Sequence, residues 1–199
     1  MFKIAPDIQA LIFDCDGTLA DTMEVHYQAW EETLAHFGKV YPRAKLEQCL
    51  GIPAADLIRM LNREFGWELD PQFFSSKKER RFRELAVLVR PIEPVAAVAR
   101  AYSGKLPMAV ASGGTRDNVE FTLEAIGLQG VFDAVITADD AVAPKPSPEI
   151  FLEAARRLGV PPQACLVFED GAPGIKGARL AGMQVIDVTG NAPLAAALG

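Results

Sequence analysis

Short apolar runs that stop abruptly at polar, glycine-containing turns constrain the fold of this chain more than any other feature. Continuous apolar runs of this length are typical of parallel strands that are buried on both faces. Segments with helical periodicity alternate with such runs in the second half of the chain, which predicts a doubly wound parallel α/β sheet. The runs and the turns after them are Ala10–Phe13 before Asp14-Cys15-Asp16-Gly17-Thr18, Leu106–Ala111 before Ser112-Gly113-Gly114, and Ala164–Phe168 before Glu169-Asp170-Gly171.

Helix and strand positions follow from periodicity and from helix-ending residues. Thr115 and Ser147 are the expected N-caps of two helices, because their hydroxyls can accept a backbone hydrogen bond, and Asp70-Pro71 is a favourable helix start. Helices are expected over 24–37, 54–65, 91–102, 115–126, 147–158, 173–181 and 192–198, and further strands over 132–137 and 184–188.

The segment between Ala20 and Arg90 carries no strand signal. Its apolar residues recur at helical spacing, so it is interpreted as an all-helical unit inserted after the first strand. The expected domains are therefore an α/β core formed by residues 1–20 and 91–199, and a helical cap formed by residues 21–90. The length of 199 residues suits a core domain with one insertion.

Composition limits the partners of the chain. The net charge of −6 disfavours nucleic acid and anionic membranes. No apolar run approaches the length of a membrane span, and the N-terminus lacks the pattern of a signal peptide. Three cysteines without paired spacing indicate a reducing compartment. We expect a cytoplasmic monomer that binds neither nucleic acid nor membranes.

Asp14 and Asp16 follow the first strand directly. Ligands of open α/β sheets bind beyond the carboxyl ends of strands, and side chains two residues apart in extended chain point the same way. Two carboxylates so close repel each other unless a cation or a proton intervenes. Mg²⁺, which prefers carboxylate oxygens, is the expected cofactor. The alternative is a strand that ends in an ordinary Asp-Gly turn.

The other polar turns would meet these aspartates at the same edge of a parallel sheet. Together with Lys145, which lies between two prolines, they would supply acids, a hydroxyl, backbone amides and one cation for Mg²⁺ and a phosphoryl group. Taken singly, Ser112 could be a turn residue and Lys145 a solvated lysine. Glu169 and Asp170 could simply favour the positive end of the next helix.

The sequence resembles the haloacid dehalogenase-like (HAD) phosphohydrolases over nearly its whole length. The four short motifs of that family occur in order: Asp14-x-Asp16-x-Thr18, Ser112, Lys145-Pro146 and Glu169-Asp170. Within the family the chain is most similar to the β-phosphoglucomutase-like branch, and there to bacterial fructose-1-phosphate phosphatases. The runs that carry this closer likeness are Pro107–Val110 and Cys165–Asp170.

The resemblance implies a Rossmann-like core with an inserted helical cap and a Mg²⁺-dependent phosphatase acting on small sugar phosphates. Asp14 would be the nucleophile that carries an aspartyl-phosphate, and Asp16 the acid and base. Lys145 would offset charge between Asp14 and the phosphate. The implied phosphate donors are Thr18, Ser112 and the amides near Gly113, and the implied metal ligands are Asp14, the backbone carbonyl of Asp16, Glu169 and Asp170.

His26 and Lys78, in the expected cap, match positions that contact the acid–base aspartate in this branch when the cap closes. The resemblance therefore implies that they take part in substrate binding. The alternatives are a histidine with satisfied hydrogen bonds on an amphipathic helix and, for Lys78, a solvated helix face within the basic run 77–83.

Two other functions stay open. A phospho-accepting receiver domain uses similar residues on a similar sheet, but lacks a helical insert and an equivalent of Asp16. A phosphosugar mutase needs a second anion site, which in the resembling mutases uses an arginine shortly after the first cap glycine. Here Gly51 is followed by Ile52-Pro53-Ala54-Ala55, with no cation until Arg59, so a phosphatase is expected. Arg59 or Arg43 could supply the missing charge.

Overall fold

The computed structural model describes residues 4–49, 52–140 and 142–190. The chain divides into two compact units: a core unit, formed by Met1–Asp21 and Arg90–Gly199, and a cap unit, formed by Thr22–Val89. In the described part of the chain, no helix is both long and apolar enough to cross a membrane.

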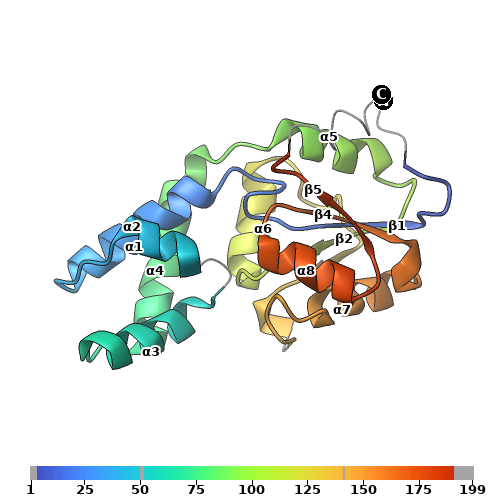
Figure 1. Ribbon diagram of the computed structural model, residues 1–199. Coiled ribbons are helices and arrows are strands. Elements are labelled where there is room, and N and C mark those ends of the chain that lie inside the picture. The colour runs from blue at the N-terminus through green and yellow to red at the C-terminus, as the bar shows by residue number, and fades with distance from the viewer. Residues whose placement is uncertain (1–3, 50–51, 141, 191–199) are drawn as a thin grey trace. The chain divides into compact units, whose positions relative to one another are not determined.

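The elements of the core unit alternate between strands and helices (Figure 1). Its strands are β1 (Ala10–Phe13), β2 (Met108–Ala111), β3 (Ala134–Ile136), β4 (Cys165–Glu169) and β5 (Gln184–Asp187). Its helices are α5 (Glu93–Tyr102), α6 (Arg116–Ala125), α7 (Glu149–Leu158) and α8 (Ala172–Leu180), with short 3₁₀ turns η3 (Ala138–Asp140) and η4 (Pro162–Ala164).

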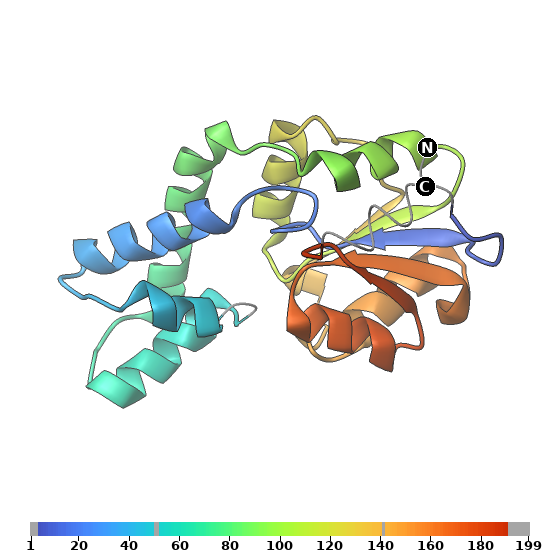
Figure 2. The ribbon, with the colours of Figure 1, turned by 45° about the horizontal axis from the view of Figure 1, so that its top comes forward.

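The five strands form one parallel sheet in the order β3-β2-β1-β4-β5. Helices α5 and α6 cover one face and α7 and α8 the other, as Figure 1 shows, and Figure 2 shows β1 in the middle of the sheet. Every residue of β1, β2 and β4 is buried. The parallel sheet with helices on both faces confirms the predicted doubly wound α/β fold. Strands that are covered on both faces form nearly continuous apolar runs, as β1 and β2 do here.

The core packs mainly through these strands. Phe13 of β1 stacks on Phe168 of β4, with ring centroids 4.8 Å apart, and meets Phe132 edge to face. On the other face of the sheet, Phe151 of α7 is fully buried in a cluster that includes the strand residues Ile12 and Val167. Burial of such side chains is worth about 1.5–3 kcal/mol each, so this packing fixes the strand ends that carry the polar turns.

The cap unit contains only helices in its described residues, as predicted from the missing strand signal. Helix α4 packs against α1 and α3, and the apolar cluster between them contains Trp30, Leu61 and Phe74. Asp70 caps α4 by accepting hydrogen bonds from the backbone N–H groups of Gln72 and Phe73. The elements are α1 (Met23–His36), α2 (Arg43–Leu46), η1 (Glu47–Cys49), α3 (Ala54–Phe65), α4 (Pro71–Leu85) and η2 (Ala86–Leu88).

The two chain segments that lead into and out of the cap run beside each other. The Asp21 N–H donates to the Arg90 carbonyl, and the Ile92 N–H donates to the Leu19 carbonyl. Ala20 and Pro91 form an isolated antiparallel bridge between these bonds. The helical insertion therefore leaves and re-enters the core at one place.

The two predicted helix caps have different outcomes in the structure. Thr115 stands at the N-cap of α6, but its buried hydroxyl has no hydrogen-bond partner, and Asp139 accepts from the Arg116 N–H. At α6 a carboxylate from a distant part of the chain thus replaces the local side-chain cap, which sequence spacing cannot reveal. Helix α7 begins at Glu149 with Pro148 at its N-cap position, but the Ser147 hydroxyl one residue earlier accepts a hydrogen bond from the Glu149 N–H at 3.4 Å, as a capping serine would. The helix predicted over 192–198 lies outside the described residues.

Candidate active site

Lys145 joins the first and the fourth strands of the core. Its Nζ donates to Asp14 Oδ1 at 2.6 Å and to Glu169 Oε2 at 2.6 Å. Asp14 follows β1, and Glu169 ends β4, which pairs with β1 in parallel. All three side chains are at least nine-tenths buried. The predicted meeting of these residues at one sheet edge is therefore observed.

Glu169 depends on two glycines of the next turn and helix. Its Oε1 accepts a hydrogen bond from the Gly171 N–H at 3.0 Å. A methyl group on Gly174 would lie 2.0 Å from Glu169 Oε2, which no real structure tolerates. Gly174 therefore leaves the space that the carboxylate occupies. A glycine inside a helix destabilises the helix by about 1 kcal/mol relative to alanine. Its presence within a predicted helix is the sequence signal that could have pointed to the role of Gly174.

Asp170 is held by the turn after β1. Thr18 Oγ1 donates to Asp170 Oδ1 at 2.7 Å, and Thr18 is fully buried. Gly17 has a φ of 84°, and a methyl group there would lie 2.4 Å from Asp170 Oδ2. Since a hydroxyl has one proton, this bond makes Thr18 a support for Asp170, and its contact with a phosphate stays a prediction.

The three acids form a site that fits a cation. One oxygen from each of Asp14, Glu169 and Asp170 lies within 4.8 Å of the others. Burial, and after it the charge of Glu169, raises the pKa of Asp14 well above its usual range, although Lys145 opposes this. Burial also raises the pKa of Asp170. With one lysine for three acids, the site is short of positive charge. Its carboxylate oxygens are the ligands that a hard divalent ion prefers.

Lys145 keeps its charge in this setting. Burial alone would lower its pKa, but Asp14 and Glu169 together raise the pKa above its usual value. The ammonium also lies 5.3 Å from the centre of the Phe151 ring, an attractive cation–π distance. The interpretation of Lys145 as a solvated loop residue is therefore wrong.

Asp16, Ser112 and Gly113 lie around a second turn of the same edge. The Ser112 hydroxyl accepts from the Gly114 N–H at 3.0 Å, which leaves its proton for another acceptor. An added methyl group on Gly114 would lie 3.6 Å from Asp16 Oδ2, so the Asp16 carboxylate lies beside this turn. Gly113 is exposed. The carboxylate of Asp16 is not one of the three that cluster among the described residues.

The cap residues His26 and Lys78 contact each other. Lys78 Nζ lies 3.1 Å from His26 Nδ1 and 3.3 Å from Glu79 Oε1, and the His26 ring stacks on Phe82. Lys78 is 5% exposed, so the interpretation of it as part of a solvated helix face is wrong. Whether the pair binds substrate stays a prediction.

Cys15 separates the two aspartates but is no candidate nucleophile. Burial, and after it the charge of Asp16, raises the pKa of its thiol well above the usual value. Burial raises the pKa of Cys165 to about 11. Thiols held in the protonated form are poor nucleophiles. All three cysteines of the chain are free thiols in the structure.

Comparison with known proteins agrees with this geometry. The family described as haloacid dehalogenase-like hydrolase matches residues 8–182. This chain belongs to that family. The resemblance predicted from the four motifs is therefore confirmed at the level of the family.

Several relatives of this hydrolase are phosphatases or phosphosugar enzymes by name. The fructose-1-phosphate phosphatase YqaB of Escherichia coli is 40% identical over 182 residues, which cover 89% of this chain and 95% of that protein. The crystal structure of CbbY from Rhodobacter sphaeroides in complex with phosphate has a TM-score of 0.81 at 28% identity, covering 89% of this chain and 84% of that one. The β-phosphoglucomutase of Clostridium difficile has a TM-score of 0.79 at 27% identity, covering 89% and 83%.

Proposed function

We propose that this hydrolase is a Mg²⁺-dependent phosphatase that hydrolyses small sugar phosphates such as fructose 1-phosphate through an aspartyl-phosphate. The observation that supports it most is the Asp14 carboxylate at the end of β1, bonded to the Lys145 ammonium beside two further acids. The proposed sugar follows from the fructose-1-phosphate phosphatase that is 40% identical.

The proposed reaction has two steps. Asp14 attacks phosphorus in line, the bond between phosphorus and the sugar oxygen breaks, and Asp16 gives its proton to that oxygen. Asp16 then takes a proton from water, which attacks the aspartyl-phosphate and releases inorganic phosphate and the Asp14 carboxylate. Lys145 keeps Asp14 oriented and offsets its charge as the dianion approaches. Ser112 and the amide of Gly113 donate to phosphate oxygens.

Asp14, Glu169, Asp170 and the backbone carbonyl of Asp16 are the proposed ligands of Mg²⁺. When bound, the ion neutralises repulsion between these acids and the phosphate dianion. The fit rests on the excess of buried carboxylates over cations.

Release of inorganic phosphate from a panel of hexose and pentose phosphates, with Mg²⁺ and with excess chelator, tests this function. We expect fructose 1-phosphate to be among the fastest substrates and the chelator to abolish turnover. Failure to release phosphate from any sugar phosphate would contradict a phosphatase. Full activity in excess chelator would contradict the metal. A receiver domain would be phosphorylated once without sustained turnover.

A phosphosugar mutase is the second candidate, because β-phosphoglucomutase is among the structural relatives. The two cap arginines that could form a second phosphate site already have acidic partners. Arg43 pairs with Glu24 and Glu31, and Arg59 pairs with Asp56. Gly51, the start of the loop on which the mutase comparison depends, lies outside the described residues.

Supplying β-glucose 1-phosphate with a trace of its bisphosphate, and fructose 1-phosphate separately, distinguishes the two enzymes. We expect free phosphate from fructose 1-phosphate and little glucose 6-phosphate, since a buried dianion without a free cation would be costly. Rapid formation of glucose 6-phosphate, with little free phosphate from either sugar, would make the mutase the correct assignment.

Asp170→Ala should weaken activation by Mg²⁺ more than Glu169→Ala does. Both oxygens of Glu169 already accept hydrogen bonds, from Gly171 and Lys145, whereas Asp170 accepts the Thr18 hydroxyl on Oδ1. We expect the half-activating Mg²⁺ concentration to rise at least about tenfold more for Asp170→Ala, in the range known for altered metal shells. Equal shifts in a titration of activity against Mg²⁺ would contradict this ranking.

A further inference from the structure

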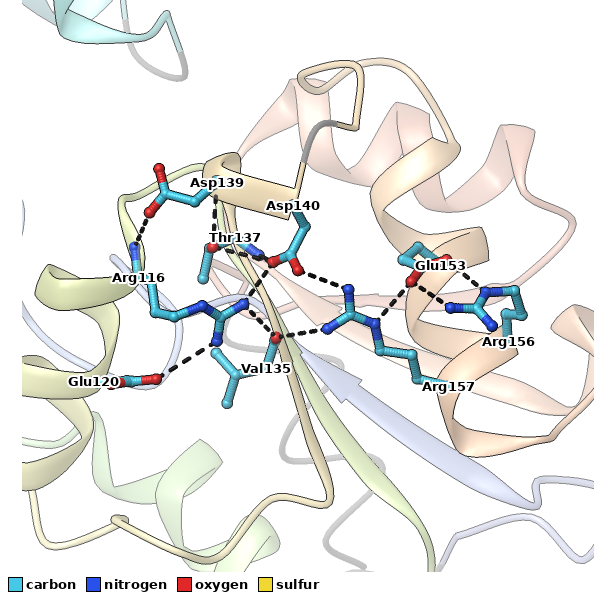
Figure 3. A network of polar contacts seen from close by, with 9 residues as sticks. All are labelled: Arg116, Glu120, Val135, Thr137, Asp139, Asp140, Glu153, Arg156 and Arg157. Carbon is cyan, nitrogen blue, oxygen red and sulfur yellow. Dashed lines mark hydrogen bonds and ion pairs between the residues drawn. The ribbon is translucent and has the colours of Figure 1, made fainter.

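Asp140, at the end of η3, lies at the centre of a charged network that joins three elements of the core (Figure 3). Its Oδ2 accepts from Arg116 of α6 at 2.7 Å, and its Oδ1 accepts from Arg157 of α7 at 2.6 Å. Both guanidinium groups also donate to the carbonyl of Val135 in the edge strand β3. The side chain of Asp140 is 12% exposed, so the network is largely shielded from water.

The network links the chain before the segment that carries Lys145 to the helix after that segment. Asp140 comes before this lysine segment, defined as residues 142–148, and Arg157 lies in the helix that follows it. Ala143 N–H also donates to Glu149 at the start of that helix. Pinning both ends of a segment restricts where its side chains can reach, and Lys145 must hold its ammonium 2.6 Å from Asp14.

The same network holds the turn formed by Ser112–Gly114. Asp140 accepts from the N–H and the hydroxyl of Thr137, which fixes the start of η3. Ala138, the next residue, donates its N–H to the Gly114 carbonyl at 3.0 Å. Moving η3 would therefore shift the support of the Ser112 turn as well as the lysine segment.

We propose that Asp140 is a positioning residue, which through Arg116, Arg157 and Thr137 sets the Lys145 ammonium and the Ser112 turn at the distances that turnover needs. It touches neither substrate nor the reacting atoms. This inference rests on the proposed phosphatase function only for the kinetic part of its test.

An ionised carboxylate suits this position and an amide does not. The Asp140 carboxylate accepts four hydrogen bonds, from two guanidinium groups, one backbone N–H and one hydroxyl. Burial would raise its pKa, but hydrogen bonds from Arg157 and Thr137 outweigh this and lower the pKa to about 2. In Asp140→Asn, the NH₂ group would face these donors, so at least one of them loses its acceptor.

The experiment compares Asp140→Asn with Glu153→Gln, a matched change of acid to amide in the same network. Glu153 accepts hydrogen bonds from the side chains of Arg156 and Arg157. These bonds involve neither η3 nor the Ser112–Gly114 turn. Kinetics are measured well below the unfolding temperature of each variant, so that loss of stability alone leaves kcat unchanged. Hydrogen exchange at the Ala138 amide is measured alongside, because it reports η3 without any substrate.

We expect kcat on a sugar phosphate to fall about tenfold in Asp140→Asn, a modest displacement of catalytic groups, and to stay within about twofold in Glu153→Gln. The Ala138 amide should exchange faster only in the first variant. Should Asp140→Asn not fold, Arg157→Gln, which keeps the Thr137 and Arg116 contacts, carries the same test with a smaller loss of protection and kcat.

Unchanged kcat and unchanged Ala138 exchange in a folded Asp140→Asn, or in a folded Arg157→Gln where the first variant does not fold, would overturn the proposal. Equal loss of kcat in Glu153→Gln would overturn it too. If the parent protein hydrolyses no phosphate ester, the phosphatase proposal fails, and the Ala138 exchange still decides whether Asp140 holds the turns.

Discussion

Replacing Asp14 with asparagine should lower kcat by about a thousandfold or more while the fold stays intact. Loss of a nucleophile removes the covalent step altogether, and such changes cost several orders of magnitude. The fold should persist because asparagine has nearly the shape of aspartate and Lys145 keeps its 2.6 Å contact with Glu169. Phosphate release with excess sugar phosphate and Mg²⁺ measures the first effect, and circular dichroism with thermal unfolding measures the second.

Asp187→Asn is the matched control for this change. Asp187 ends β5 and stands opposite Glu169 in the register of the sheet, yet its carboxylate accepts from Thr189. It is thus an acid at the carboxyl end of a neighbouring strand, outside the cluster. We expect kcat of this variant to stay within about twofold of the parent. If Asp14→Asn kept more than about a hundredth of the parent activity, Asp14 would not be the nucleophile.

The chemistry-bearing residues of the core could be predicted from sequence because topology decides where they lie. Asp14, Glu169 and Asp170 each follow an apolar run, and parallel pairing of β1 with β4 brings the ends of these runs together. This inference needs only strand positions and direction, which short apolar runs and intervening helices indicate reliably. Lys145 could be added because it lies just ahead of a helix that returns to the same sheet.

Features that depend on side-chain packing between distant segments could not be predicted. The basic run 77–83 indicates a solvated face, but Lys78 is buried against His26 of another helix. Spacing favours Thr115 as a side-chain cap, but its hydroxyl has no hydrogen-bond partner, and the first N–H of the helix, that of Arg116, donates to Asp139. In each case a partner far along the chain decides the interaction, and sequence periodicity carries no signal of that partner.

Gly174 belongs to the same class, and replacing it with alanine should have a large effect on the site. The added methyl group would overlap Glu169, with 2.0 Å to Oε2 and 2.7 Å to Cγ. Helix propensity alone favours alanine by about 1 kcal/mol. Displacing Glu169 costs more, because a buried charged pair that loses one partner is destabilised by about 3–5 kcal/mol. We therefore expect a net loss of about 2–4 kcal/mol in the free energy of unfolding and a fall in kcat/KM of about a hundredfold.

A double-mutant cycle with Glu169→Ala separates the clash from every other effect of the methyl group. Shortening Glu169 to alanine removes the three atoms nearest to the added methyl group, so Gly174→Ala should now stabilise the protein by up to about 1 kcal/mol. Urea unfolding of the parent, both single variants and the double variant measures the coupling. The sign of the Gly174→Ala effect should thus reverse between the two backgrounds. The same destabilisation in both would mean that the glycine is required by the helix backbone and not by the Glu169 carboxylate.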